Sequence, residues 1–112
     1  MRVCNNRFVN CNTRCIDIAY FDAGDQCIAK ENREILVEGN TFTHWGAHET
    51  IHRGFTPQCP IRIANADGVI IRNNNFEDPG AHDRPVRVLI EKSDHVTLDG
   101  NRDLHESAIR RQ

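Results

Sequence analysis

The most constraining feature of the sequence is a segment of 17 residues that occurs three times and ends each time in an asparagine turn. The three copies align without a gap at 26–42, 60–76 and 87–103, and the end of a fourth copy is present at 3–8. Apolar residues alternate with polar ones along each copy, which predicts two short strands with one buried face. Because one such unit cannot bury its apolar face alone, the copies are expected to stack as a solenoid of parallel strands.

Four asparagines mark the same turn in successive copies. They follow one another at intervals of 34, 34 and 27 residues, and they are Asn6, Asn40, Asn74 and Asn101. An asparagine at the same bend of neighbouring layers can pass a side-chain hydrogen bond to the next copy, so we predict a ladder of these side chains. Three phenylalanines follow two positions later and are expected to stack in the core: Phe8, Phe42 and Phe76.

The alignment also predicts which residues share a column across the stacked strands. The buried columns are expected to hold Cys27, Ile61 and Val88; Ala29, Ile63 and Ile90; Ile35, Val69 and Val96; and Val3, Val37, Ile71 and Leu98. A third strand is expected at 15–18, outside the copies. On the outer face, Glu38, Arg72 and Asp99 would form a column whose charge alternates in sign, which favours this register.

The segments ILVEGNTF, GVIIRNNNF and HVTLDGN carry a resemblance to a known repeat. They resemble the coil endings of the right-handed parallel β-helix in the pectate-lyase-like superfamily. This resemblance implies an all-β, right-handed parallel β-helix of about three to four coils over residues 1–103. Residues 104–112 depart from the repeat and are expected to form a polar cap or a frayed tail.

The segments between the copies vary, and loops on a rigid scaffold commonly carry function. The insert 43–59 contains His48-Glu49-Thr50-Ile51-His52, which matches the H-E-x-x-H zinc motif of metalloproteases. On a helix, His44, His48 and His52 would lie on one face and could bind a metal. Gly46 weakens such a helix, and an insert between strands is not the setting of that motif. A metal-binding loop at 44–52 is therefore a minor alternative, and no cofactor is expected.

A sugar-binding interpretation of the same insert uses different chemistry. Trp45 would stack on a sugar ring, and four polar residues would contact its hydroxyls: His48, Glu49, His52 and Arg53. The plain alternative is a loop whose Trp45 folds back over the core.

The order of several motifs carries a closer resemblance. The chain has Asn-Asn-x-Phe-x-Asn-Cys-Asn-Thr, then an Ile-x-Ile strand, an EGNTF ending and a Pro-Ile-x-Ile-Ala segment. In this order they are similar to the later coils of glycoside hydrolase family 110, β-helix enzymes that remove terminal α-linked galactose with inversion. Inversion needs a carboxylic acid and a carboxylate. The family's adjacent aspartate pair has no counterpart in this sequence, so the catalytic residues are unknown and the chain alone is expected to be inactive.

The resemblance implies the C-terminal β-helix portion of a carbohydrate-active enzyme, with a glycan as its partner. The alternative is a non-catalytic β-helix module for binding or structure. A charged fraction of 27% and a net charge of -2 favour neither nucleic acid nor an anionic membrane. No signal peptide is present in this chain, and the full-length protein would be secreted or periplasmic. The first copy lacks its start, so we expect upstream coils or a homo-oligomer to cover that end.

Overall fold

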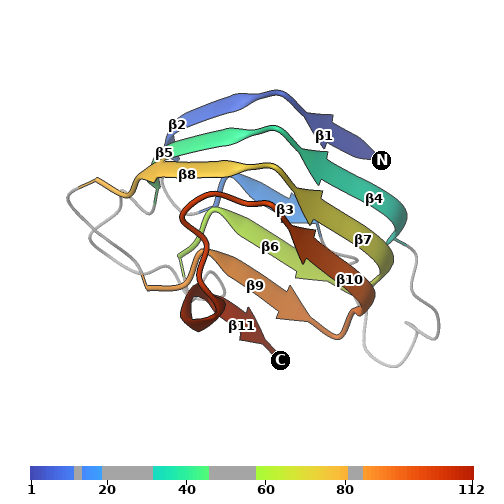
Figure 1. Ribbon diagram of the computed structural model, residues 1–112. Coiled ribbons are helices and arrows are strands. Elements are labelled where there is room, and N and C mark those ends of the chain that lie inside the picture. Colours follow the sequence, from blue (N-terminus) through green and yellow to red (C-terminus); the bar gives the residue numbers. More distant parts are fainter. Residues whose placement is uncertain (12–13, 19–31, 46–57, 81–84) are drawn as a thin grey trace.

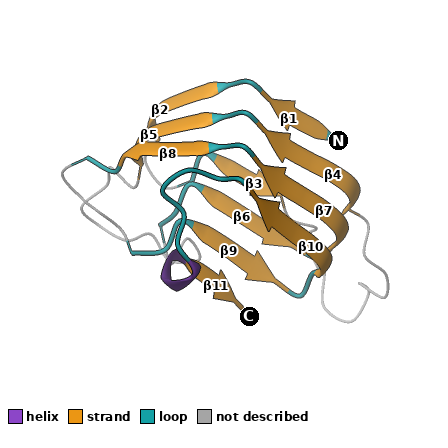
Figure 2. Ribbon diagram, in the orientation of Figure 1, coloured by secondary structure: helices purple, strands orange, loops and turns teal. Residues whose placement is uncertain are grey.

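The computed structural model describes residues 1–11, 14–18, 32–45, 58–80 and 85–112. Within these residues the chain is almost entirely β-structure, and its one helical turn is the 3-10 helix η1 (Glu106–Ala108), as Figure 2 shows. Every strand pair is parallel. The prediction of an all-β fold with parallel strands is therefore confirmed.

The strands form three sheets, which Figure 1 shows as three faces around one interior. Sheet A contains, in spatial order, β1 (Arg2–Cys4), β4 (Asn32–Glu38), β7 (Ala66–Arg72) and β10 (Asp94–Asp99). Sheet B contains β2 (Arg7–Cys11), β5 (Thr41–Trp45) and β8 (Asn75–Asp78). Sheet C contains β3 (Ile16–Ile18), β6 (Ile61–Ala64), β9 (Val88–Glu91) and β11 (Ile109–Arg111).

Successive strands visit sheets A, B and C in turn, and each such passage is called a coil here. The first coil is β1 to β3, the second β4 to β6, the third β7 to β9, and the fourth comprises β10 and β11. In the fourth coil sheet B is reduced to a single bridge between Asn75 and Arg102. Equivalent strands therefore lie one above another, and the two chain ends lie at opposite ends of the stack (Figure 1).

The observed register confirms most of the predicted columns. Ile35 pairs with Val69, which pairs with Val96, and the next inward column runs through Val3, Val37, Ile71 and Leu98. The third strand expected at 15–18 is also present, as β3.

Two predicted columns were wrong in one member each, although Ile61 pairs with Val88 and Ile63 with Ile90 as predicted. Cys27 and Ala29 were aligned with Ile61 and Ile63, but the strand beside Ile61 and Ile63 on that side is β3, through Ile16 and Ile18. With β9 on its other side, β6 has no free edge at these positions for a third strand. Cys27 and Ala29 lie outside the described residues.

The interior is filled by aliphatic columns and by one aromatic stack. Phe42 lies between Phe8 and Phe76, with ring centroids 5.2 and 5.0 Å apart and ring planes within 15° of parallel. The sheets contribute the remaining inward residues, among them Val37, Ile63, Val69 and others that are almost fully buried. The predicted phenylalanine stack is present, and it joins the first three coils through one continuous core.

The asparagine ladder is also present. Asn40 donates from its backbone nitrogen and from Nδ2 to Oδ1 of Asn74, at 2.9 and 3.0 Å. Asn6 makes the same two bonds to Asn40, and Asn74 makes them to Asn101. The Nδ2 groups of Asn40, Asn74 and Asn101 also donate to a backbone carbonyl of the preceding coil, as Asn74 does to Val37. Asn40 and Asn74 are almost fully buried, so these bonds satisfy polar groups that water cannot reach.

The residue before each ladder asparagine has a left-handed backbone, and the type of residue alternates along the stack. These residues are Asn5, Gly39, Asn73 and Gly100, with φ between 55° and 68°. Asn and Gly are the residues that tolerate this conformation best. The side chains of Asn5 and Asn73 occupy the space that a Cβ on Gly39 or Gly100 would need. Alternation of large and small residues therefore lets adjacent turns stack closely.

Residues 104–112 continue the ordered structure at the C-terminal end. After η1 the chain forms β11, which pairs with β9 and ends with Gln112 hydrogen-bonded to the backbone of Ile90 and Lys92. Leu104 and Ile109 pack against the main core. Of the two expectations for this segment, a cap describes it and a frayed tail does not.

Candidate functional site

Most residues of the predicted sugar-binding insert lie outside the described residues: His48, Glu49, His52 and Arg53. The alternative metal ligands share this position except for His44. Among the residues that the structure describes, no group of three His, Cys, Asp or Glu side chains is placed to hold a metal ion. Of the candidate site residues in this insert, the structure therefore places only His44 and Trp45, both at the end of β5.

Trp45 lies in the core. Its residue is 1% exposed, its ring meets Phe76 edge-to-face at 6.1 Å, and the Arg87 guanidinium lies 5.2 Å from its ring centroid. The cause is local, because His44 adopts a left-handed φ of 54° and shifts the alternation of β5, so that Phe42 and Trp45 both point inward. The predicted role of Trp45 as a stacking platform does not fit this buried position.

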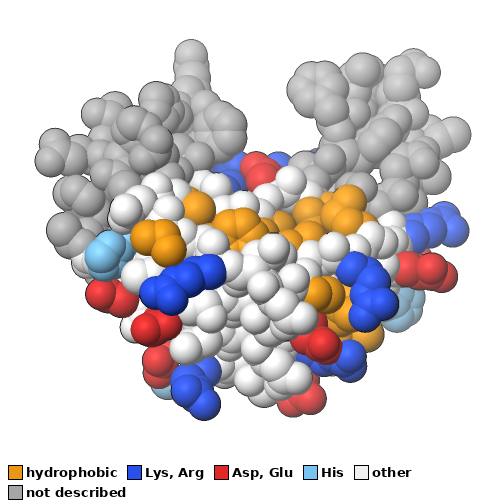
Figure 3. Space-filling view, turned by 90° about the horizontal axis from the view of Figure 1, so that it is seen from above, with side chains coloured by type: hydrophobic (Ala, Val, Ile, Leu, Met, Phe, Trp, Pro, Cys, Tyr) orange, Lys and Arg blue, Asp and Glu red, His pale blue; other side chains and the backbone are white. Residues whose placement is uncertain are grey.

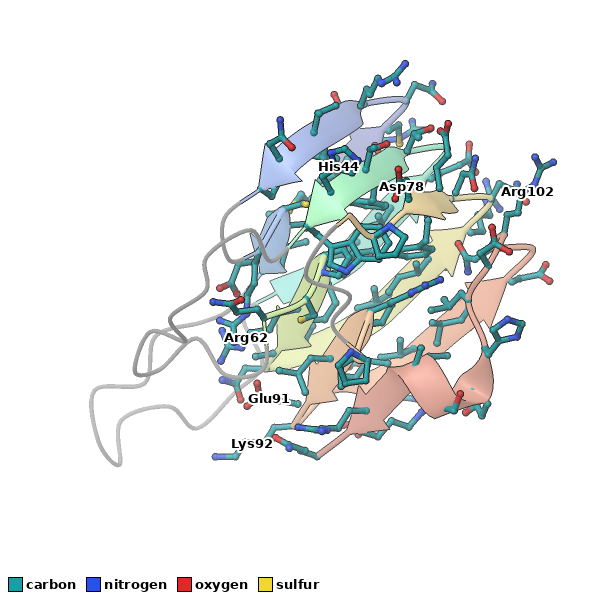
Figure 4. The ribbon with its side chains drawn as sticks, turned by 90° about the vertical axis from the view of Figure 1, so that its left-hand side faces the viewer. His44, Arg62, Asp78, Glu91, Lys92 and Arg102 are labelled. Carbon is teal, nitrogen blue, oxygen red and sulfur yellow. The ribbon has the colours of Figure 1, made fainter. Side chains whose placement is uncertain are left out.

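The side chain of His44 lies on the outer face of sheet B, between Asn10 of the first coil and Asp78 of the third coil. Its Nδ1 is 3.2 Å from Asn10 Oδ1, and its Nε2 is 3.1 Å from Asp78 Oδ2 (Figure 4). A neutral imidazole donates only one hydrogen bond, so both contacts as drawn require the imidazolium form or a rotated Asn10 amide. The backbone N–H of Gly80 and then His44 lower the pKa of Asp78. The cluster is a partly exposed ion pair with one more polar neighbour.

The outer face of sheet C carries the strongest polar constellation in the described residues. Asp17 on β3, Arg62 on β6 and Glu91 on β9 form what we call the sheet C charge row. Arg62 Nη1 donates to Asp17 Oδ1 at 3.0 Å, and Arg62 Nε donates to Glu91 Oε1 at 2.9 Å. Asp17 lies opposite Arg62 in the register, and Glu91 lies diagonally, opposite Ala64.

The electrostatics of the sheet C charge row centre on Arg62. Partial burial opposes its charge, but the hydrogen bonds that Arg62 donates to Glu91 and Asp17 outweigh this effect and raise the pKa of the guanidinium. Arg14 adds a second cation, with Nη1 3.1 Å from Asp17 Oδ2. The side chains of Asp17, Arg62 and Glu91 keep between 23% and 30% of their exposure, so the row remains open to a ligand at the surface.

A small apolar cluster lies beside the sheet C charge row. Cys59, Val86 and Leu89 are buried together on the outer side of the sheet, because Leu89 occupies the outward column of Arg62. Burial is the main cause that raises the pKa of the Cys59 thiol to about 11, while Arg14 opposes the shift. A polar row next to an apolar cluster is the composition that small-molecule sites commonly have.

Variable segments between the copies, among them 9–25 and 43–59, are connected to this sheet. Residues 19–31 follow directly after β3, and residues 46–57 lead into the segment before β6. The sheet C charge row therefore lies on the two strands whose connections carry the sequence variation, which favours it as the candidate functional site.

Comparisons of the chain with protein-family models, with curated proteins and with solved structures give no match. Within the described residues, no helix has the length and apolar character needed to span a bilayer.

Sequence reasoning missed Asp17, Arg62 and Glu91 as functional candidates. A signal was present, because outward positions on strands next to the inserts alternate in charge as Asp17 and Arg62 do. The sequence analysis took its candidate binding residues from the insert 43–59. It used outward strand positions only to support the register of sheet A. Glu91 was hidden further, since it lies diagonally from Arg62 and shares no column with it.

Proposed function

We propose that this chain is a segment of right-handed parallel β-helix from a carbohydrate-active protein, and that it binds glycan on the outer face of sheet C. The passage of the chain through sheets A, B and C in a fixed order supports the β-helix. The resemblance of its motifs to the later coils of glycoside hydrolase family 110 supports terminal α-linked galactose as the ligand class.

The observation that carries the proposal is the sheet C charge row. Arg62, Asp17 and Glu91 offer planar donor and acceptor groups at neighbouring positions, and they are held in place by one another. Adjacent hydroxyls of a sugar ring present donors and acceptors at similar spacing. Because the side chains are already ordered by hydrogen bonds, binding costs little conformational entropy.

The same geometry supports binding without turnover. A general acid must carry a proton that it gives to the leaving group. Asp17 Oδ1 and Glu91 Oε1 both accept hydrogen bonds from the Arg62 guanidinium, so these oxygens serve as acceptors and not as proton donors. Neither carboxylate is therefore suited to the acid role. We expect the chain alone to hydrolyse no aryl α-galactoside.

The test is a titration of the full chain with oligosaccharides that end in α-galactose. Binding is measured by calorimetry or by changes in NMR chemical shifts. We expect Arg62→Gln to weaken binding by about tenfold or more, since a hydrogen bond to a charged group contributes about 1.5–3 kcal/mol. Arg72→Gln is the matched control, because Arg72 also pairs with a carboxylate of a neighbouring coil, Glu38, but lies on sheet A.

Three results would count against the proposal. They are an absence of binding at millimolar glycan, an equal loss in both arginine variants, and an equal preference for β-galactosides. Turnover of an α-galactoside by the wild-type chain would contradict the absence of catalytic residues while leaving glycan recognition in place.

A further inference from the structure

The outer face of sheet A has an apolar hollow over its two central strands, β4 and β7. Its volume is about 470 Å³, which lies in the range of small-molecule sites in proteins. Leu36 and Ile70 pair in the register and form its floor, and Ile70 is 40% exposed. Figure 3 shows that hydrophobic side chains also reach the outer surface of the molecule, next to charged ones. The hollow is therefore an apolar site within a polar face.

The hollow is open because Gly68 stands between two residues with long side chains. Glu34, Gly68 and His95 share one column of sheet A, since the pairs on either side of them are in register. All three have a left-handed backbone, with φ of 52°, 84° and 53°. A glutamate and a histidine adopt this conformation here, so the conformation alone does not require glycine. A Cβ on Gly68 would meet only the Glu34 backbone nitrogen, at 3.7 Å, so glycine leaves a space in the column.

The polar groups that line the hollow favour a cationic ligand. Within the described residues, the Glu34 carboxylate forms no hydrogen bond and no ion pair. The other charged lining residues have partners of opposite charge. Arg72 forms an ion pair with Glu38, and His95 Nδ1 lies 2.6 Å from Asp67 Oδ1. The uncompensated charge at the hollow is therefore negative.

The strands around the hollow support the same sign. Together β4, β7 and β10 carry five carboxylates and two guanidinium groups, a formal charge of −3 (2 − 5) with histidine neutral. A negative face raises the local concentration of cations and favours their capture. A metal ion does not suit the hollow, because it requires several oxygen ligands and the floor is apolar. The lining instead suits a cation that carries an apolar body.

We propose that this hollow binds a small organic ammonium ion. Its apolar body lies on Leu36 and Ile70, and its ammonium group pairs with the Glu34 carboxylate in the space above Gly68. Burial of the body supplies most of the affinity, and the ion pair fixes the orientation. The site lies on sheet A, so the inference goes beyond glycan binding at the sheet C charge row and does not depend on it.

The test is an NMR titration of the full chain with hexylammonium chloride. Hexanol and the hexanoate anion are the matched ligands, since they have the same apolar body with no charge or with the opposite charge. We expect chemical-shift changes around Gly68 and Ile70. Hexanol should bind about fivefold more weakly, which is the contribution of one exposed ion pair, and hexanoate more weakly still. Butylammonium should lose about twofold to fourfold in affinity for each missing methylene.

Two variants test the shape of the hollow. Gly68→Asn fills the space with a residue that tolerates the left-handed backbone, and it should abolish the binding of hexylammonium. Ile70→Thr keeps a β-branched side chain but removes apolar surface from the floor, so hexylammonium and hexanol should both bind more weakly. Circular dichroism establishes that each variant is folded, and Ile70→Thr tests the site even where Gly68→Asn does not fold.

A third variant tests the charge. Glu34→Gln keeps the shape of the side chain, so hexylammonium and hexanol should bind to it with equal affinity. Glu77→Gln is the matched control, because Glu77 is an exposed carboxylate on β8 of sheet B. This control should bind hexylammonium as the wild type does.

Four results would overturn the proposal. They are an absence of chemical-shift changes at millimolar hexylammonium, equal affinity for hexanoate and hexylammonium, unchanged binding in folded Gly68→Asn or Ile70→Thr, and an equal loss in Glu34→Gln and Glu77→Gln. Glycan binding on sheet C is measured separately and would stand or fall on its own titration.

Discussion

The two ends of the coil stack differ in one respect that determines how each meets its surroundings. At the N-terminal end the inward columns finish in aliphatic and aromatic side chains, Val3, Phe8 and Ile18, with the ladder oxygen of Asn6 unfilled. At the C-terminal end the sheet C column finishes in Arg111, which forms an ion pair with Glu106 of η1. Leu104 packs on the core there. Within the described residues, the inward columns of the first coil end in apolar side chains, and the sheet C column of the last coil ends in a charge.

This difference shows that the repeat pattern does not determine the structure of the terminal coils. Each internal coil satisfies its backbone, its ladder asparagine and its apolar columns through two neighbours, whereas a terminal coil has only one. At the C-terminal end, residues outside the repeat supply a charge and a short helix in place of the missing neighbour. At the N-terminal end no described residue does so.

The largest expected effect separates the interior of the ladder from its open end. Asn74→Ala removes four side-chain hydrogen bonds. The buried backbone nitrogen of Asn40 and the carbonyl of Val37 lose this partner, whereas Asn40 Nδ2 keeps its bond to Val3 and Asn101 Oδ1 keeps its bond from the Asn74 backbone. We expect a loss of about 3–5 kcal/mol in the free energy of unfolding, at about 1–3 kcal/mol for each buried orphan. Asn6→Ala removes one partly buried side-chain bond and should cost about 1 kcal/mol or less.

Urea denaturation of both variants measures this contrast. Similar losses at Asn74 and Asn6 would mean that the ladder is not the source of the difference between interior and end.

The next effect concerns the free energy of unfolding at alkaline pH. The buried thiol of Cys59 and the thiol of Cys4 on the edge strand β1 should contribute differently to it. The pKa of Cys59 is raised from 9.0 to about 11, chiefly by burial. Its folded thiol keeps a proton that the unfolded thiol loses, so stability is complete below pH 9 and declines as the pH rises toward 11. At about 1.4 kcal/mol per pH unit, the loss approaches about 2.7 kcal/mol.

Cys59→Ala should flatten that decline when the free energy of unfolding is measured between pH 8 and pH 11. Cys4→Ala is the control, since Cys4 lies on the edge strand β1 and is only partly buried. If the free energy of unfolding of Cys59→Ala falls with pH as steeply as that of the wild type, other groups cause the loss of stability at alkaline pH.

A third prediction converts the closed end into an open one. Arg111→Ile completes the column of Ile18, Ile63 and Ile90, so copies can stack head to tail without burying a charge. A head-to-tail contact does not close, and the expected product is a chain of copies whose mass rises with concentration. Arg110→Ile is the matched control on the outward column of the same strand.

Light scattering distinguishes these outcomes, and Val3→Lys introduced together with Arg111→Ile should restore the monomer. A monomeric Arg111→Ile protein would show that η1 and Leu104, and not the charge, close this end.

Sequence reasoning identified what the repeat determines and failed where the repeat is interrupted. The ladder asparagines, the phenylalanine stack and the columns of sheet A follow from alternation within the aligned copies, and the structure contains them. The alignment of Cys27 with Ile61 failed because a gapless match of letters cannot show that β3, which lies outside the copies, already fills that edge.

The site was less accessible to sequence reasoning than the fold. The sequence left Trp45 either stacked on a sugar or folded back over the core, and it did not show that the left-handed residue His44 shifts the period of β5 by one position. Arg62 and Glu91 contact each other diagonally, and diagonal contacts do not follow from columns. Residues 48–53 are outside the described residues, and their predicted roles stay predictions.

The smallest expected effect concerns the outer charge column of sheet A, which stops short of the open end. Glu38 forms an ion pair with Arg72, Arg72 lies opposite Asp99, and the position next to Glu38 in the first coil is Cys4. Cys4→Arg extends the alternation by one residue and should stabilise the fold by about 0.3–0.5 kcal/mol, whereas Cys4→Glu should destabilise it by a similar amount. Both effects should vanish in 1 M salt, because exposed charges are screened there.

Equal effects of the two variants at low salt would mean that loss of the thiol, and not charge, dominates. In that case the open end would differ from the interior in its inward columns only, and the outer face would play no part in the contrast between the two ends.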